Sequence, residues 1–126
     1  MTNKEQHSKI MKAVKKYIKK LDLTDRTIDC HLVSETSIEH EWYDACVTSR
    51  DYRIGEYDIN FTKEAFHNID EIALHELLHV LLWGICEVVD GIVKVGAFTE
   101  EQRKRMLLKL DEQEHLVIYK LIKALK

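Results

Sequence analysis

Apolar residues recur at helical spacing in the first and last parts of the chain. Residues 4–21 carry them on one side of a predicted helix and lysines on the other. Residues 99–125 continue in the same way, and Thr99 followed by Gln102 is typical of a helix N-terminus. Both segments are predicted to be helices that pack one face on a core.

Three short segments between these helices alternate apolar and polar residues, as β-strands do. The residues expected on the core side are Ile28, Cys30 and Leu32, then Tyr43, Ala45 and Val47, then Tyr57, Ile59 and Phe61. One face on a core and one near water is typical of antiparallel sheets. We therefore expect a three-stranded, mainly antiparallel sheet.

Residues 69–89 are apolar around nearly the whole circumference of a predicted helix, which should therefore be central. Asn68 followed by Glu71 has the form of a capping box at its start. The next residues, "DGIVKVGAF", are predicted to be a loop or short strand. This order of elements predicts an α+β fold. With no proline and no low-complexity linker, residues 1–126 are predicted to form one domain.

The composition favours a soluble protein, with 33% charged residues and a formal net charge of −3. The lysine-rich first twenty residues contain no apolar signal segment, so we expect a cytoplasmic protein. Acids and histidines interrupt the apolar run 69–89, which argues against a membrane span. The three cysteines lack metal or disulfide spacing and are predicted to be reduced core residues. The lysines of the first helix are interpreted as a solvated face rather than a nucleic-acid site.

Three polar residues interrupt the apolar run "ALHELLHVLL": His75, Glu76 and His79. Burying them without partners costs several kcal/mol. The two histidines lie one helical turn apart and supply half of a tetrahedral zinc site, while Glu76 is placed to take a proton from metal-bound water. The alternative is two core histidines bonded to backbone carbonyls and a glutamate that reaches solvent.

A catalytic zinc usually has three protein ligands. Glu114 completes the apolar stripe of the last helix, and a carboxylate on a buried face needs a cation or a strong donor. We therefore predict Glu114 as the third ligand. Glu87 lies too far along the central helix to reach the same ion. The less well placed alternatives are Glu100, Glu101, Glu112 and His115.

Several other residues have candidate supporting roles. Asp111 is placed to accept the outer N–H of a ligating histidine, although a solvated surface acid is the alternative. Candidate donors to a developing oxyanion are His115, Tyr119, Tyr57 and Tyr43. The remaining histidines have no ligand spacing and are interpreted as surface or edge residues: His7, His31, His40 and His67.

The stretches "IDEIALHELLHVLLW" and "EQEHLVIYKLIKAL" resemble the short zincin-type metallopeptidases with a glutamate as third ligand. They are more closely similar to small metallopeptidase domains of phages and mobile elements, over about residues 57–125. In the wider gluzincin group this resemblance implies zinc ligation by His75, His79 and Glu114, with Glu76 as general base. It also implies that the strand "YDINF" forms a cleft edge to which an extended peptide adds as a further strand.

The residue pattern and the resemblance together favour a zinc-dependent metallopeptidase that acts on a peptide or protein. The alternative is a non-catalytic interaction protein of a mobile element, which binds a host protein or nucleic acid through its lysine-rich helix and keeps a structural or vestigial metal site. Glu76 speaks against this alternative, because a structural histidine pair needs no carboxylate there. A non-peptidase metal hydrolase is a third hypothesis.

Overall fold

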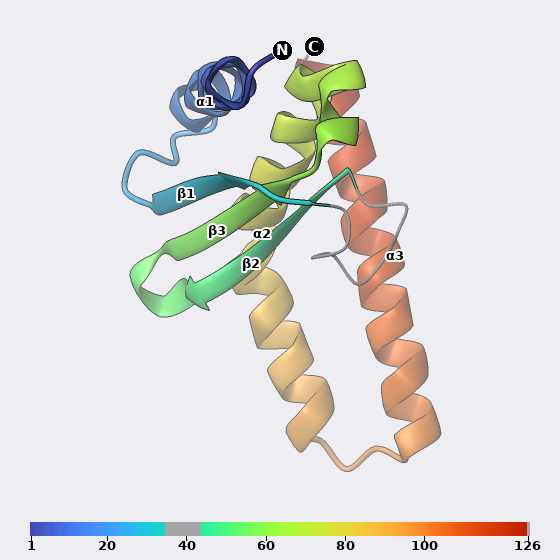
Figure 1. Cartoon of the computed structure of the whole chain (residues 1–126). Helices are drawn as coiled ribbons and strands as arrows, with labels where there is room; N and C mark the ends of the chain where they lie inside the picture. Colours follow the sequence, from blue (N-terminus) through green and yellow to red (C-terminus); the bar gives the residue numbers. More distant parts are fainter. Residues whose placement is uncertain (35–43, 126) are drawn as a thin grey trace. The chain divides into compact units, whose positions relative to one another are not determined.

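The computed structural model describes residues 1–34 and 44–125 (Figure 1). The chain divides into two compact units, Met1–Val80 and Leu81–Lys126, and each unit is described by itself. The described residues form three helices and a three-stranded mixed sheet. The predicted α+β class is confirmed.

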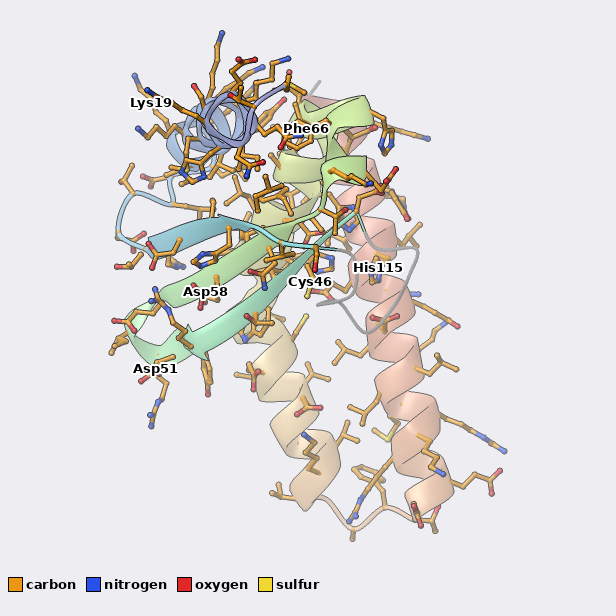
Figure 2. The ribbon with its side chains drawn as sticks, in the orientation of Figure 1. Lys19, Cys46, Asp51, Asp58, Phe66 and His115 are labelled. Atoms are coloured by element: carbon orange, nitrogen blue, oxygen red, sulfur yellow. The ribbon has the colours of Figure 1, made fainter. Side chains whose placement is uncertain are left out.

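The first helix of the first unit, α1, spans Asn3–Lys20. Its start is fixed by Thr2, whose hydroxyl accepts a hydrogen bond from the backbone N–H of Glu5 at 3.1 Å. Its lysines are exposed, as with Lys19 in Figure 2. The apolar side of the helix is buried as predicted, at Ile10, Ala13, Val14 and Tyr17.

The sheet consists of β1 (Thr27–Leu32), β2 (Ala45–Asp51) and β3 (Glu56–Phe61), with β3 in the middle (Figure 1). A tight turn at Gly55, with φ of +72°, leads from β2 into the antiparallel β3. The prediction of antiparallel pairing is wrong for β1, which runs parallel to β3. Alternation of apolar and polar residues fixes the face of each side chain but not the direction of the strand.

Because β3 is paired on both sides, it is not an edge strand of the described sheet. The expectation that "YDINF" forms the edge of a cleft is therefore wrong for the described residues. In the described sheet, the outer strands are β1 and β2. Tyr43, which was expected in the second strand, lies outside the described residues.

The two faces of the sheet differ as the alternation predicts. The core face is apolar, and its fully or nearly buried side chains are Cys30, Ala45, Tyr57, Ile59 and Phe61. On the other face, Arg50 contacts Asp29 at 2.7 Å and Asp58 at 3.3 Å, and His31 contacts Asp58 at 3.0 Å (Figure 2). A polar network of this kind marks the face that meets water.

The central helix, α2, spans Ile69–Val95 and follows the short 3₁₀ helix η3, Lys63–Asn68. The prediction that residues 90–98 form a loop or strand is wrong up to Val95. Gly91 costs helix stability but does not end a helix by itself, and Asp90 forms an ion pair with Lys94 one turn later at 2.8 Å.

The third helix, α3, spans Glu100–Leu125. Its start is the predicted capping box, because Thr99 accepts from the Gln102 N–H at 3.1 Å and Gln102 accepts from the Thr99 N–H at 2.9 Å. Arg103 donates to the carbonyl of Gly96 at 3.2 Å and ties the turn to the helix. The second unit is thus a hairpin of the last part of α2 and α3.

One helix, Lys63–Val95, is long and apolar enough to cross a membrane by length and composition alone. No other helix within residues 1–34 and 44–125 meets this criterion. The core helix of a soluble protein also meets it, so the finding is consistent with a soluble protein. The three cysteines are free; Cys30 is buried in the core as predicted, whereas Cys46 and Cys86 are only half-buried.

Candidate metal-binding residues

His75 and His79 lie one turn apart on α2, in the part of the helix that belongs to the first unit. Their Nε2 atoms are 3.1 Å apart, and the ring centroids are 4.9 Å apart with an interplanar angle of 63°. Both side chains are half-buried, and the surrounding apolar residues Leu74, Leu77 and Leu78 are fully buried. Helical periodicity therefore brings the two ring nitrogens together on a half-buried face of an otherwise buried helix segment.

The distance between the two Nε2 atoms fits a shared zinc ion. Two nitrogen ligands at about 2.0–2.1 Å from a tetrahedral zinc are separated by about 3.4 Å. The observed 3.1 Å needs only a small adjustment of the two side chains. Without a cation, one nitrogen would have to carry a hydrogen and donate it to the other. Imidazole is also a preferred zinc ligand, so the chemistry and the spacing agree.

Glu76 is buried, with 7% of its surface exposed. It follows His75 directly in α2 and is therefore rotated by about 100° around the helix axis. This position places its carboxylate beside the histidine pair rather than in line with it. A buried carboxylate needs a counter-charge or hydrogen-bond donors, and its environment can raise its basicity for proton transfer.

A second group of candidate ligands lies on α3 in the second unit. One ligand atom each of Asp111, Glu114 and His115 lies within 4.8 Å of the other two. Glu114 and His115 are half-buried, whereas Asp111 is exposed. These are the predicted third ligand, Glu114, its alternative His115, and the predicted supporting acid Asp111. They lie close together on α3, where Figure 2 labels His115.

A backbone hydrogen bond orients the His115 ring. Its Nδ1 lies 2.9 Å from the carbonyl oxygen of Asp111, and a carbonyl only accepts, so Nδ1 carries the hydrogen. In the neutral ring the lone pair is then on Nε2. Metal-ligating histidines are oriented in this way by a carbonyl or carboxylate on the other nitrogen. His115 therefore stays a rival of Glu114.

Within the second unit, Glu114 also contacts Cys86 of α2. The pKa of the Cys86 thiol is raised to about 11, mainly by burial, with smaller contributions from the charge of Glu114 and from a hydrogen bond to its carboxylate. The thiol donates to the carboxylate, so Glu114 faces α2. The sequence interpretation of Cys86 as an ordinary core residue missed this contact. The signal was its position seven residues after His79, a spacing that repeats on one helix face.

The three tyrosines predicted as donors to a developing oxyanion differ in their surroundings. Tyr119 is exposed on α3, and its ring centroid is 6.5 Å from that of His115. Tyr57 is buried on the core side of β3. Tyr43 lies outside the described residues. Of the three predicted tyrosines, Tyr119 therefore has an observed ring contact with a member of the α3 ligand group, His115.

The remaining polar candidates behave as surface residues. Glu100 and Glu101 form exposed ion pairs one turn along α3, and Glu112 is also exposed. His7, His31 and His67 are exposed, as predicted, and His40 lies outside the described residues.

Comparisons with known proteins add no assignment, because no family model, curated protein or solved structure matches this chain.

Proposed function

We propose that this protein is a zinc-dependent metallopeptidase in which His75 and His79 bind the metal. The observation that carries the proposal is the pair of Nε2 atoms, 3.1 Å apart, with a buried carboxylate at the adjacent position 76. An ordinary pair of core histidines would not need that carboxylate. A metal and a general base use all three polar residues of the motif.

We assign the third ligand to Glu114. Three protein ligands leave a fourth zinc position open, which is the arrangement of catalytic rather than structural zinc sites. Glu114 has the half-buried carboxylate that the apolar stripe of α3 predicts, and it lies within a group of ligand atoms. His115 is the rival, since its Nε2 bears the lone pair.

In this proposal Glu76 is the general base and general acid. A zinc ion held by His75, His79 and Glu114 would supply activation of a water molecule and polarisation of a substrate carbonyl. The Glu76 carboxylate accepts the proton from the attacking water and returns it to the nitrogen of the leaving amine.

The proposed substrate is a peptide or protein in extended form. Since β3 is paired on both sides, a substrate added as a further strand would pair with β1 or β2. A cytoplasmic location is part of the same proposal and rests on the soluble composition.

Metal analysis of purified variants tests the ligands. The wild type is expected to hold about one zinc per chain, and His79→Ala and Glu114→Ala are expected to lose it. Glu112→Ala, an exposed glutamate on the same helix as Glu114, and His67→Ala, an exposed histidine, are matched controls that should keep it. Loss of zinc from His115→Ala but not from Glu114→Ala would transfer the third ligand to His115. Equal zinc content in all variants would refute the site.

Cleavage of an unstructured protein such as casein tests the activity. Glu76→Gln is expected to retain zinc and lose cleavage, because the amide has the shape of the carboxylate but accepts no proton. A Glu76→Gln protein that still cleaves casein would remove Glu76 from the mechanism. Salt-sensitive nucleic-acid binding that disappears when the lysines of α1 are neutralised would instead support the interaction protein.

A further inference from the structure

The part of α2 in the second unit carries an exposed apolar stripe. Its members are separated by four, three, four and three residues, the spacing of one continuous helix face. The exposed fractions are large for such side chains: 39% at Leu81, 66% at Ile85, 63% at Val88, 58% at Ile92 and 87% at Val95. Soluble monomers rarely expose a contiguous apolar patch of this extent.

Two glycines lie beside the stripe and leave its surface open. A Cβ atom built on Gly84 or on Gly91 would meet no atom within 4 Å. Both glycines lie inside a helix, where glycine costs stability relative to alanine. The helix therefore keeps two shallow positions, about two turns apart, beside its exposed apolar residues.

The charged residues of this part of α2 lie away from the stripe. Asp90 pairs with Lys94 at 2.8 Å, and Glu87 accepts a hydrogen bond from the indole of Trp83 at 3.1 Å. By helical spacing these residues project from the opposite side of α2. Covering the stripe would therefore desolvate no charge.

We propose that this stripe is the docking surface for a second copy of the chain, with the two α2 helices antiparallel about a two-fold axis at Val88. With the axis at Val88, a residue that precedes Val88 by a given number of positions lies opposite the residue of the second copy that follows Val88 by the same number. Gly84 then faces Ile92 of the second copy, and Ile85 faces its Gly91. Each large isoleucine is then level with a glycine, whose lack of a side chain lets two helices related by a two-fold axis approach closely.

The available area is sufficient for such a dimer. A large aliphatic side chain offers about 100 Å² of apolar surface, so five exposed residues on each of two copies remove roughly 1,000 Å² from water. This area lies below that of stable specific interfaces, about 1,200–2,000 Å², and in the range of weak, transient ones. The surface thus supports a weak, reversible dimer that does not depend on the metal site.

A lipid surface is the less favoured occupant. Helices that lie on membranes carry lysine and arginine on the polar face, since bilayer surfaces are anionic. The polar face here carries Glu87 and Asp90 against one Lys94.

Analytical ultracentrifugation of the full chain tests the dimer. The wild type is expected to associate reversibly with concentration. Val88→Glu, which brings two like charges together at the axis, should weaken association by about 100-fold or more. Leu108→Glu is the matched control, because Leu108 is equally exposed at 61% but lies on α3, and it should dimerise like the wild type. Circular dichroism of both variants checks that they are folded.

Disulfide trapping tests the orientation. Val88→Cys should crosslink two copies at the axis, whereas Val95→Cys should not, since position 95 faces position 81 of the other copy. Crosslinking of both variants would indicate parallel helices and overturn the antiparallel arrangement. A wild type that stays monomeric, or that sediments with phosphatidylserine vesicles as a monomer, would overturn the proposal.

Discussion

The two parts of α2 have similar composition but opposite surroundings. In the first unit the apolar residues of the helix are buried, among them Leu74, Leu77 and Leu78. After Val80 the helix remains apolar, yet Ile85 and its neighbours on the stripe are exposed. An apolar helix face in the sequence therefore does not tell by itself whether the same chain buries that face.

The same contrast holds for the two units as wholes. Of the nineteen buried hydrophobic residues in the described ranges, sixteen belong to Met1–Val80. Of the twelve exposed large hydrophobic residues there, nine belong to Leu81–Lys126. Hydrophobic burial is the dominant stabilising term in folding, so the first unit holds most of the core that stabilises the chain.

The largest expected effect comes from truncating one large aliphatic residue in each part of α2. Leu77→Ala should lower the free energy of unfolding by about 2–5 kcal/mol, because it removes buried methyl groups and leaves a cavity. Ile85→Ala should change the stability of the monomer by no more than about 0.5 kcal/mol, since most of its side chain already meets water. Urea denaturation at low protein concentration measures both, and equal losses would contradict the contrast.

The stability of the first unit should depend on pH through its buried thiol, Cys30. Burial, with a smaller contribution from the charge of Asp29, raises the pKa of the Cys30 thiol to about 12. In the unfolded chain the thiol ionises near pH 9, so its contribution to stability is complete below pH 9 and is lost as the pH rises toward 12. Between pH 8 and pH 10 the wild type should lose about 1 kcal/mol more than Cys30→Ala. Parallel unfolding curves for the two proteins at both pH values would show that the thiol is not buried as described.

The elements that sequence predicts best are those fixed by local contacts. The ends of α1 and the capping box of α3 follow from hydrogen bonds within one helical turn. The prediction of a loop or short strand after residue 89 is wrong up to Val95, where the ion pair of Asp90 with Lys94 supports the continuing helix despite Gly91. The direction of β1 was also misjudged, since alternation carries no information on strand direction.

The candidate site divides in the same way. The close approach of His75 to His79 follows from helical periodicity alone, so their spacing in sequence was sufficient. The contact of Cys86 with Glu114 joins residues of two helices, and such a pairing depends on how helices pack rather than on any local pattern. Sequence reasoning therefore finds the motif more readily than its neighbours.

The smallest expected effect has opposite signs for the monomer and the proposed dimer. Gly91→Ala should stabilise the monomer by about 0.5–1 kcal/mol, because alanine favours a helix and its Cβ meets open space. The same methyl group would fill the position opposite Ile85 of a second copy and weaken association. Thermal unfolding at low concentration and sedimentation at high concentration measure the two effects. A Gly91→Ala variant that unfolds at a higher temperature and also associates as strongly as the wild type would place Gly91 outside the interface. The exposed part of α2 would then lack the self-complementary surface inferred for it.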